Sequence, residues 1–539
     1  MADGSLDDPA PSARNLEAWS RHLGYRVEDA VHLREYLAAG PTLPAAFGSV
    51  ARRYPNHPAL TVDELTLTHA EVELAAHQMA ADLQRLGVRS GTGVVVVADT
   101  DMAVMLAYLG ALRSGVVTTF AHRSSTASEL ADVVGAVNAK YVLATGESLG
   151  RLSEASVGVR TIGLKDSDRE SIQSLPGDAL ANPERVSVPT DPDSTAIVAF
   201  TSGSTGKPKP VPLSHRNLLT SIRGAMSAWR WSASDRLVHS LPIGHQHGLG
   251  GIHAALLSGS HTIVLPRFDT ARLITTVDSE NATVLFAVPA IYDRMLSEAP
   301  DQLHRFAALR LMISGSAPLP PDVAVDVEEM TGQMPLERYG STEAGLDVSN
   351  PYDGPRLPGT VGLPLPGVEM ALIDPAGRLV DDGDTGEVVL RGPQVFGGYG
   401  GGEDQPFVAG WFRTGDLAVV DPPTGYLRLL GRTKEVIITG GMNVYPSEVE
   451  RALRDVAGVI DAAVIGTPSR RWGEAVTAFV VMRGGTSADV AAALESRLAP
   501  FKRPKAIIEL EAIPRTRMGK LRRESLESWA KENSRATDV

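Results

Sequence analysis

The segment Thr201–Lys209 carries the residue types that bind phosphate. It reads Thr-Ser-Gly-Ser-Thr-Gly-Lys-Pro-Lys and directly follows the apolar run Thr195–Phe200. Small residues let backbone N–H groups approach an anion, hydroxyls add donors, and the two lysines supply positive charge. The segment is not a Walker A loop, because Thr201 stands where that motif has its first glycine and Pro208 where it has Ser or Thr. The alternative is a flexible surface loop. Phosphate binding is favoured because flexible linkers rarely place this residue composition directly after a buried strand.

Strands alternating with helices are predicted on both sides of this loop. Thr68 and Glu71 have the spacing of a capping box, which begins a helix. Val94–Val97 is typical of a buried parallel strand, and a helix is expected over Met102–Arg113. Further strands are indicated by the apolar runs Thr195–Phe200, Thr283–Val288 and Leu309–Ile313. This alternation predicts an α/β fold with largely parallel sheets.

The sequence pattern changes towards the C-terminus. Gly359–Leu430 has short strands among many Gly and Pro residues, which predicts a β subdomain. After Gly431 a compact α+β pattern follows. We therefore expect an N-terminal extension over residues 1–40, a large N-terminal domain over 41–431 and a small α+β C-terminal domain over 432–539. The large domain is expected to hold the α/β part plus the β subdomain.

Composition narrows the possible functions. The chain has 539 residues, of which 43% are hydrophobic and 21% charged, as in soluble globular proteins. Its net charge of 51 − 64 = −13 argues against a nucleic-acid partner. The absence of cysteine excludes disulfides, thiolate zinc sites and a cysteine nucleophile. Because no apolar stretch approaches the ~20 residues of a membrane span and the polar start lacks a secretory pattern, we expect a cytoplasmic protein with no membrane partner.

The loop and five later segments resemble, in order and spacing, the adenylate-forming superfamily of acyl-CoA synthetases, luciferases and peptide-synthetase adenylation domains. The later segments are Tyr339–Glu343, Gly410–Asp416, Gly431–Glu435, Gly440–Glu450 and Pro514–Lys520. The resemblance runs from about Leu43 to Arg522. It implies that the large domain holds two α/β subdomains plus the β subdomain and that the small C-terminal domain is mobile. Three middle segments look most like malonyl-CoA synthetases and other short-acid CoA ligases, namely Leu241–Leu249, Leu285–Tyr292 and Pro358–Gly362. One departure is Phe396–Gly402, which is richer in glycine than such enzymes are.

The resemblance implies a reaction in two steps. A carboxylate joins the α-phosphate of ATP with release of pyrophosphate, and a second nucleophile, often the thiol of CoA, then attacks the acyl adenylate. Because both partners in the first step are anions, the site must supply cations and oriented donors. ATP, Mg²⁺ and CoA are the implied cofactors and co-substrate, and Glu343 is the implied magnesium ligand. The implied ATP-binding residues are Thr201, Ser202, Gly203, Ser204, Thr205, Gly206, Lys207, Ser316, Ala317, Pro318, Tyr339, Gly340, Ser341, Asp416 and Arg432.

Catalytic roles are implied for Lys520, Glu343, Thr342 and His245. Lys520 would align the attacking carboxylate with the phosphate that repels it. A solvated lysine in a basic tail is the alternative for Lys520. Lys434 matches the hinge about which the C-terminal domain of such enzymes rotates, whereas a solvated strand lysine is the alternative there. Gly440 and Gly441 would line the channel for the thiol.

The acid and the acceptor are less closely defined. The resemblance implies an acyl pocket of His245, His247, Tyr292, Gly315, Gly340 and Asp347. A long alkyl chain would leave polar groups among them without partners, at ~1–3 kcal/mol each. We therefore expect a small polar or aromatic carboxylic acid, of which an amino-substituted acid is one form. The alternative is that the histidines are satisfied core residues and that Asp347 faces solvent.

CoA is the expected acceptor. The alternatives are an amine, a carrier-protein thiol or a nitrite-derived acceptor, as in an amide synthetase, an acyl-carrier ligase or a diazotase. A third possibility, besides a CoA ligase and an adenylating enzyme with another acceptor, is a nucleotide-binding protein of the same family that has no catalytic activity. The presence of Lys520, Glu343 and Asp416 together argues against that class, because a decayed enzyme has no chemical need for all three.

Overall fold

The computed structural model describes eleven stretches of the chain. They are residues 6–8, 10–30, 32–98, 100–123, 125–145, 159–164, 188–201, 209–400, 405–469, 471–516 and 519–534. The chain divides into two compact units. The large unit comprises Asp3–Met370 and Leu390–Phe412, and the small unit comprises Ala371–Val389 and Arg413–Val539.

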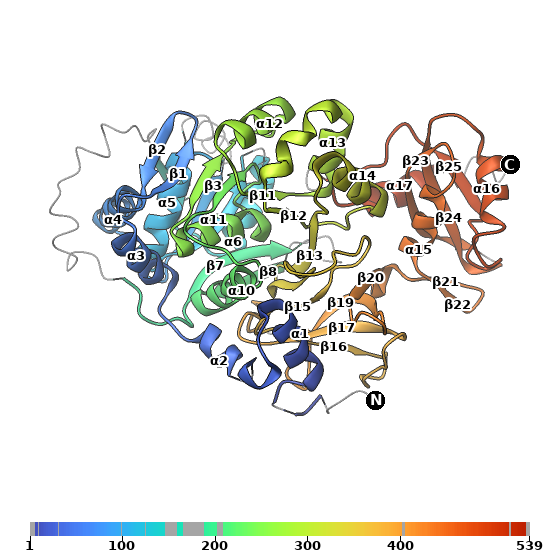
Figure 1. Cartoon of the computed structure of the whole chain (residues 1–539), viewed down its shortest axis with the longest axis horizontal. Coiled ribbons are helices and arrows are strands. Elements are labelled where there is room, and N and C mark those ends of the chain that lie inside the picture. Colours follow the sequence, from blue (N-terminus) through green and yellow to red (C-terminus); the bar gives the residue numbers. More distant parts are fainter. Residues whose placement is uncertain are drawn as a thin grey trace. The chain divides into compact units, whose positions relative to one another are not determined.

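A six-stranded sheet forms one half of the large unit (Figure 1). Its strands, in spatial order, are β6 (Arg160–Gly163), β5 (Tyr141–Ala144), β3 (Gly93–Ala98), β4 (Val117–His122), β7 (Thr195–Thr201) and β8 (Lys209–Ser214). All neighbours are parallel except β7 and β8, which form an antiparallel hairpin. Val94–Val97 of β3 are buried, as a continuous apolar run in a parallel strand requires.

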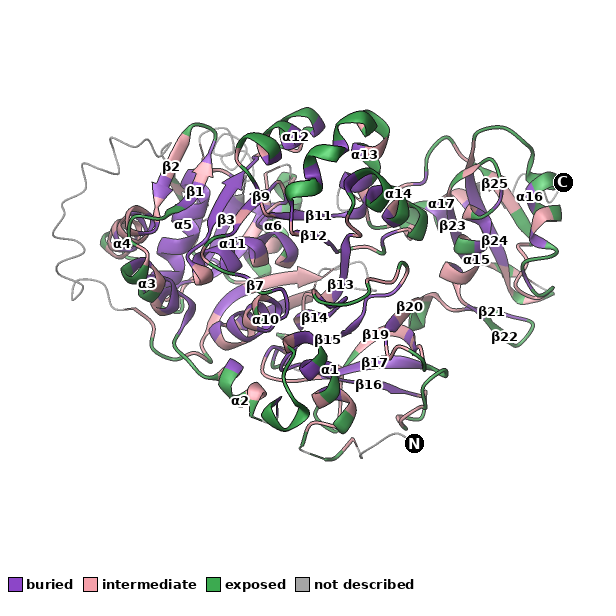
Figure 2. Cartoon of the chain, in the orientation of Figure 1, coloured by how far each residue is buried: buried purple, intermediate pink, exposed green. Residues whose placement is uncertain are grey.

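A nine-stranded sheet forms the other half of the large unit. Its order is β15 (Leu363–Pro364), β14 (Gly345–Ser349), β13 (Leu336–Ser341), β12 (Leu311–Ser314), β11 (Val284–Ala287), β9 (Arg236–His239), β10 (His261–Val264), β1 (Pro58–Val62) and β2 (Leu65–Thr68). The six strands from β13 to β1 are parallel, and antiparallel strands flank them on both sides. Figure 2 shows β11 and β12 as buried strands, whereas α12 and α13 turn exposed faces outwards.

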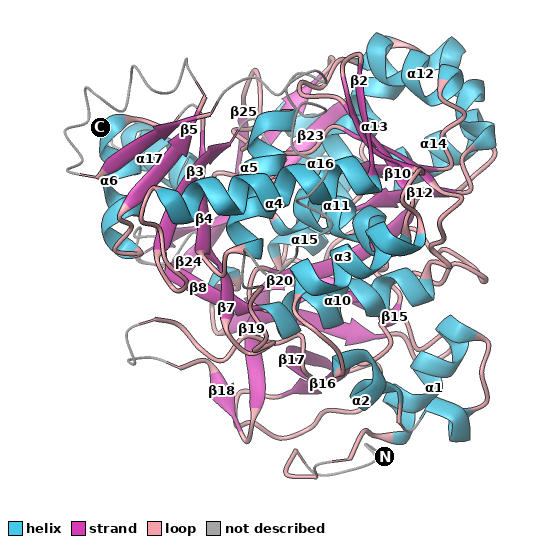
Figure 3. Cartoon of the chain, turned by 90° about the vertical axis from the view of Figure 1, so that its left-hand side faces the viewer, coloured by secondary structure: helices cyan, strands magenta, loops and turns pink. Residues whose placement is uncertain are grey.

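Helices cover both sheets. They are α1 (Ala13–Leu23), α2 (Leu33–Ala38), α3 (Leu43–Arg53), α4 (His69–Arg85), α5 (Met102–Arg113), α6 (Ala127–Ala136), α10 (His215–Ala228), α11 (Gln246–Ser258), α12 (Thr270–Ser279), α13 (Pro289–Glu298) and α14 (Pro321–Thr331), with short 3₁₀ helices at Val27–Ala30 and Pro300–Ala308. Figure 3 shows α4 and α11 between strands β3–β5 and strands β10 and β12. Every residue of α5 is buried, which explains why that helix is apolar on all sides.

A third sheet and an α+β region follow along the chain. The third sheet has the order β16 (Glu369–Ile373), β17 (Thr385–Arg391), β19 (Trp411–Val420) and β18 (Phe407–Val408), and β20 (Leu427–Arg432) also pairs with β19. After the 3₁₀ helix η4 (Thr433–Glu435), the C-terminal sheet has the order β22 (Met442–Val444), β21 (Ile437–Thr439), β24 (Gly473–Met482) and β23 (Val459–Ser469), with β25 (Ala506–Glu509) also on β24. Its helices are α15 (Pro446–Arg454), α16 (Ser487–Leu494) and α17 (Arg523–Ser534).

The N-terminal segment, for which the sequence suggested no role, packs against the rest of the large unit. Trp19 of α1 is fully buried, and its indole N–H donates to the Val368 carbonyl at 3.0 Å. Asn15 exchanges two hydrogen bonds with the backbone of Met370, at 3.1 and 3.3 Å. Helix α1 is therefore part of the folded unit.

The predicted α/β class is confirmed, and so are several element boundaries. The helix Met102–Arg113 is found as predicted, and the capping box at Thr68 is complete. The hydroxyl of Thr68 accepts from the Glu71 N–H, and the Glu71 carboxylate accepts from the Thr68 N–H at 2.8 Å. The division of the chain at residues 40 and 431 stays a prediction.

Candidate active site

The predicted phosphate loop connects the two strands of an antiparallel hairpin. β7 ends at Thr201 and β8 begins at Lys209, and these two residues are partners in the strand register. Ser202, Gly203, Ser204, Thr205, Gly206 and Lys207 lie outside the described residues. Strand pairing therefore holds the two ends of the predicted loop next to each other.

Thr342 and Glu343 lie in a tight turn between β13 and β14. Ser341 and Gly345 are partners across this hairpin, and the Ala344 N–H donates to the Ser341 hydroxyl at 3.1 Å. The Glu343 side chain is buried. The chain therefore reverses into a strand at Glu343 and does not begin a helix there.

The segment Ser316–Pro318, which the resemblance implies binds ATP, follows β12. Ser316 has φ of 72°, which is uncommon for a residue other than glycine and marks local strain at Ser316–Pro318. The Leu319 N–H just beyond donates to the carboxylate of Glu337 at 2.9 Å. Burial raises the pKa of Glu337 to about 8. The segment is thus anchored to β13, the strand that also carries Tyr339 and Gly340.

Several predicted site residues of the large unit follow the carboxyl ends of four adjacent parallel strands. His245 and His247 come after β9, Tyr292 after β11, Gly315–Pro318 after β12 and Thr342–Glu343 after β13. In parallel sheets the carboxyl ends lie at one edge, and ligands bind outside that edge. The topology therefore gathers residues that are about 100 positions apart in the sequence.

Asp416 and Arg432 face each other in the small unit. They are register partners on β19 and β20, and Arg432 Nε lies 3.0 Å from Asp416 Oδ1. The Asp416 side chain is largely buried, and the Arg432 side chain is half exposed. Two of the residues that the resemblance implies bind ATP thus form an ion pair with each other.

Lys434 lies in the 3₁₀ helix η4, between strands β20 and β21, and is exposed. Gly440 and Gly441 form the two-residue loop between β21 and β22, with φ of 58° and 80°. Positive φ at both central residues is the requirement of a type I′ hairpin, which two glycines meet without strain. The turn itself therefore explains the glycine pair, whether or not a thiol passes there.

Lys520 stands at the end of a tight turn. Its backbone N–H donates to the Thr516 hydroxyl at 3.1 Å, and its carbonyl accepts from the Thr516 N–H at 2.7 Å. Gly519 has φ of 78° in the same turn. The side chain of Lys520 is exposed, as a lysine that reaches a bound ligand requires.

The three ring side chains of the predicted acyl pocket differ in burial. His245 is exposed at the N-terminus of α11. His247 is buried, donates from Nε2 to the Ala287 carbonyl at 3.0 Å and stacks on Phe286 with ring centroids 5.0 Å apart. Burial and the charge of Arg338 lower the pKa of His247 well below its usual value. The hydroxyl of Tyr292 is satisfied by the Ile313 carbonyl at 3.1 Å, so this ring resembles a core residue.

Asp347 is fully buried, so the alternative that it faces solvent is wrong. Neither of its carboxylate oxygens has a hydrogen-bond partner. Burial raises the pKa of Asp347 to about 8, although the charge of Arg338 and weaker interactions with the Ser341 backbone and the Gln394 side chain act in the opposite direction. Arg338 is itself only 6% exposed, its Nε is unpartnered, and burial lowers its pKa to about 10. A Cβ at Gly315 would collide with this guanidinium, so glycine is needed at that position.

Sequence reasoning missed two residues of this region, Arg338 and Tyr399. Arg338 could have been noticed as a charged residue directly before the Tyr339–Glu343 motif. Tyr399 could have been noticed as the only large polar side chain in the glycine-rich segment Phe396–Gly402. Its hydroxyl donates to Glu343 Oε1 at 2.8 Å.

Two negative findings apply to the described stretches. They contain no group of three or more His, Cys, Asp and Glu side chains that could hold a metal ion. They also contain no helix with the length and apolar character that crossing a bilayer requires.

Two family profiles match the chain. The profile of the AMP-binding enzymes matches residues 47–400, and that of the AMP-binding enzyme C-terminal domain matches residues 448–520. Both the large unit and the α+β region thus have counterparts in the same group of proteins.

Individual relatives cover most of the chain. Oxalate–CoA ligase of Arabidopsis thaliana is 32% identical over 505 residues, which are 89% of this chain and 97% of that protein. Mitochondrial malonate–CoA ligase of Mus musculus is 35% identical over 376 residues, which are 62% of this chain and 64% of that protein. The crystal structure of ATP-bound MatB from Rhodopseudomonas palustris has a TM-score of 0.83 and 34% identity, covering 91% of this chain and 99% of that chain.

Proposed function

The chain belongs to the AMP-binding enzyme family, and we propose that it is an ATP-dependent acid–CoA ligase that forms AMP. A carboxylate oxygen attacks the α-phosphorus of ATP, which forms acyl-AMP and releases pyrophosphate. The thiol of CoA then attacks the acyl carbon, which forms the thioester and releases AMP. The relatives that support this reaction are ligases of oxalate and malonate.

One observation carries the proposal. Four adjacent parallel strands end at the segments expected to bind the acid, the adenine and the α-phosphate. A crevice outside the carboxyl ends of such strands is where α/β folds bind nucleotides. In the proposed mechanism Thr342 donates to the α-phosphate, Thr201–Lys207 binds the β- and γ-phosphates, and Asp416 accepts hydrogen bonds from the ribose hydroxyls.

Mg²⁺ fits the donor set around Glu343. This metal prefers oxygen ligands and is commonly bound through one or two carboxylates plus the phosphates of the substrate. Glu343 is a buried carboxylate on a turn, and the described residues offer no larger cluster of metal-binding side chains. The ion, when bound, neutralises charge on the phosphates, and Glu343 is the residue that holds it.

Lys520 is the catalytic lysine in this proposal. Its ammonium group contacts the attacking carboxylate and the α-phosphate together, an interaction made mainly in the transition state. We expect Lys520→Ala to lower kcat for acid-dependent pyrophosphate release by about 10²–10³. Binding of ATP, measured by calorimetry, should remain. Lys502→Ala is the matched control, because Lys502 is a lysine of the same unit that pairs with Glu448. Equal rates for Lys520→Ala and the parent enzyme would remove Lys520 from the mechanism.

The acceptor is tested by product analysis. Pyrophosphate release is measured across a panel of carboxylic acids with CoA, without CoA, and with hydroxylamine to trap acyl-AMP. An acyl-CoA product formed with release of AMP supports the ligase. Hydroxamate without any thioester would instead favour an amine, a carrier-protein thiol or a nitrite-derived acceptor. No pyrophosphate release with any acid would contradict adenylation itself.

The acid is proposed to be small and polar. A long alkyl chain cannot satisfy the unpartnered oxygens of Asp347 or the unpartnered Nε of Arg338. Ionised Asp347 compensates the charge of Arg338, repels a second carboxylate and accepts hydrogen bonds from an amino group. Comparing kcat/KM for palmitate, malonate, benzoate and aminobenzoates tests this. A clear preference for palmitate would contradict a polar pocket.

The small C-terminal region is proposed to rotate about Lys434 between the two steps. In one pose it brings Lys520 to the adenylate, and in the other it opens the thiol channel beside Gly440 and Gly441. Lys434→Pro fixes φ near −65° in η4, so one half-reaction should fail far more than the other. We expect adenylation to persist and thioester formation to drop. Equal slowing of both steps would contradict a hinge at this residue.

A further inference from the structure

The glycine-rich segment around Tyr399 has no role in the reaction described so far. Two backbone carbonyls just before it, those of Pro393 and Val395, accept from the Asn217 side-chain amide at 2.9 and 2.8 Å. Asn217 also completes the capping box of α10, the helix that directly follows β8. The segment is therefore tied to the element that continues from the phosphate-loop hairpin.

The same segment is tied to the turn that carries Glu343. The Phe396 N–H donates to the Glu343 carbonyl at 2.8 Å. The Phe396 ring packs against Tyr399 with ring centroids 5.0 Å apart and against Phe412 at 5.4 Å. Backbone and ring contacts thus fix where the Tyr399 side chain points.

Tyr399 contacts two charged residues of opposite sign. Its hydroxyl donates to Glu343 Oε1 at 2.8 Å, and the Nζ atom of Lys209 lies 5.2 Å from the centroid of its ring. Lys209 is the first residue of β8, immediately after the predicted phosphate loop. A tyrosine can make both contacts at once, because its hydroxyl donates a hydrogen bond while the face of its ring attracts a cation.

We propose that Tyr399 is a positioning residue that couples the metal ligand to the phosphate loop. The inference rests on the proposed function, since it assumes that Glu343 ligates Mg²⁺ and that Thr201–Lys207 binds the phosphates of ATP. The phenol hydroxyl donates to Oε1 of Glu343 and so would leave Oε2 as the oxygen available to a bound metal. The ring holds Lys209 at the end of the loop and keeps its ammonium group away from the carboxylate.

The two contacts can be removed separately. Tyr399→Phe keeps the ring over Lys209 but lacks the hydroxyl, so only the metal ligand loses its support. We expect the apparent KM for Mg²⁺ to rise about tenfold, with kcat at saturating Mg²⁺ within about twofold of the parent. The affinity of the ATP-loaded protein for Mn²⁺, measured by electron paramagnetic resonance without any acid present, should weaken by the same factor.

Tyr399→Leu removes both contacts. We expect the same loss in metal affinity and, in addition, a KM for ATP raised by about threefold to tenfold, because Lys209 loses its cation–π partner. Lys209→Met should raise the KM for ATP in the parent and in Tyr399→Phe, which retains the ring. It should have little further effect in Tyr399→Leu. This pattern of coupling distinguishes the ring contact from the hydroxyl contact.

Tyr108→Phe is the matched control. Tyr108 is a buried tyrosine of the same unit, and its hydroxyl forms a hydrogen bond with His253 at 2.8 Å, so neither partner is a predicted site residue. We expect this variant to lower the unfolding temperature without changing the dependence on Mg²⁺ or Mn²⁺. A general loss of packing is thereby separated from a loss of metal positioning.

Two results would overturn the inference. One is an unchanged Mn²⁺ affinity and an unchanged KM for Mg²⁺ in Tyr399→Phe while the parent enzyme is active. The other is a change of the same size in Tyr108→Phe. Failure of the parent to release pyrophosphate with any acid would instead contradict the proposed function, so the two failures are distinguishable.

Discussion

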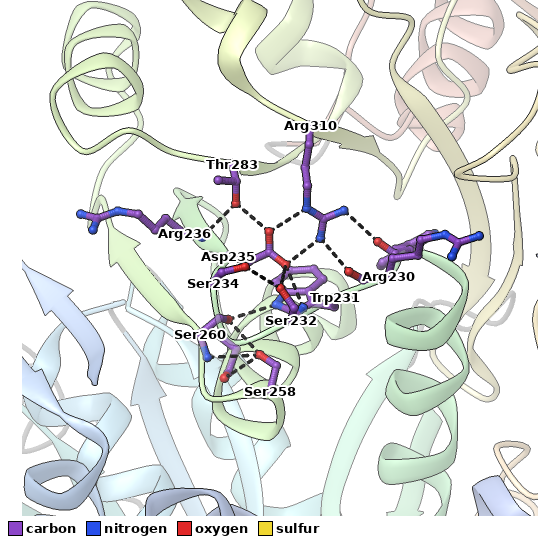
Figure 4. A network of polar contacts seen from close by, with 12 residues as sticks. Arg230, Trp231, Ser232, Ser234, Asp235, Arg236, Ser258, Ser260, Thr283 and Arg310 are labelled. Carbon is purple, nitrogen blue, oxygen red and sulfur yellow. Dashed lines mark hydrogen bonds and ion pairs between the residues drawn. The ribbon is translucent and has the colours of Figure 1, made fainter. Parts of the chain in front are cut away.

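Asp235 and Asp347 are two buried aspartates of the large unit, and their surroundings are opposite. Asp235 directly precedes β9 and is 3% exposed. Its carboxylate accepts two hydrogen bonds from Arg310 at 2.7 Å, one from the Thr283 hydroxyl at 2.8 Å and one from the Ser232 N–H at 2.8 Å (Figure 4). Asp347 lies in β14 with 0% exposure, beside Arg338, and neither of its oxygens is bonded.

The pKa values of the two carboxyl groups move in opposite directions. Burial alone would raise the pKa of Asp235, but its hydrogen bonds from Arg310, Ser232 and Thr283 outweigh burial and lower the pKa. For Asp347 burial outweighs the attraction of Arg338, and the pKa rises.

The comparison distinguishes a buried carboxylate whose hydrogen bonds stabilise the fold from one whose oxygens have no partner in the protein. A carboxylate with every acceptor position filled holds elements together, and Asp235 joins the end of α10 to β9 and to the start of β12 through Arg310. A buried carboxylate without partners lowers stability, which suits a group that makes its contacts only with a bound ligand. Asp235 thus stabilises the fold, whereas Asp347 is the aspartate that we propose contacts the substrate.

The largest expected effect is the loss of stability when the fully hydrogen-bonded carboxylate of Asp235 is removed. Asp235→Ala leaves the Arg310 guanidinium and the Thr283 hydroxyl without their partner, which should lower the free energy of unfolding by about 3–5 kcal/mol. The KM for the acid should stay within about twofold, because Asp235 lies away from the strand ends that form the site. Urea denaturation and steady-state kinetics measure the two quantities. A variant with normal stability would show that the Asp235 network is dispensable.

The next effect is a pH dependence of stability caused by Asp347. The pKa of this group is about 8 in the fold and near 3.8 in the unfolded chain, so the unfolded state binds fewer protons between these values. Stability therefore falls as pH rises from about 4 to about 8. Between pH 5 and pH 8 we expect Asp347→Asn to gain about 2–4 kcal/mol relative to the parent.

Asp235 should behave in the opposite way. Its pKa is lower in the fold than in the unfolded chain, so its contribution is present above about pH 4 and is lost below that pH. Denaturation of Asp347→Asn and Asp235→Asn at several pH values compares the two slopes. Parallel slopes for both variants would contradict the distinction between the two aspartates.

A smaller effect concerns the choice of acid. Below the pKa of Asp347, neutral Asp347 leaves the charge of Arg338 available to a second carboxylate. Above that pKa, the ionised pair favours an amino-substituted acid. Between pH 7 and pH 9 the ratio of kcat/KM for malonate to that for an aminobenzoate should fall about tenfold in the parent. In Asp347→Asn the ratio should stay constant, and an equal fall there would show that Asp347 does not face the acid.

The smallest effect comes from a single bond of the Asp235 network. Thr283→Val preserves the shape of the side chain but removes the hydroxyl that donates to Asp235 and accepts from the Arg236 N–H at 2.9 Å. We expect a loss of about 1 kcal/mol in unfolding free energy with unchanged kinetics. A loss as large as that of Asp235→Ala would mean that the network acts as one unit rather than as separable bonds.

Local patterns in the sequence predicted local structure well. The capping box at Thr68, the helix Met102–Arg113 and the strand that precedes the phosphate loop all depend on neighbouring residues, and each is found. The turn at Glu343 was not foreseen, because its motif carries no signal for the strand reversal that pairs Ser341 with Gly345. The contacts of Tyr399 with Glu343 and Lys209 join positions more than 50 residues apart, so no local pattern could indicate them.

The sequence by itself determined the family, the α/β class and the residues that match the family's motifs, because these depend on residue type and spacing along the chain. Only the tertiary structure decided which side chains are buried and which polar atoms find partners. Asp235 and Asp347 are the same residue with an arginine in each environment, and nothing in the linear sequence distinguishes them. Their difference arises because burial and hydrogen bonding depend on elements that the fold brings together from distant parts of the chain.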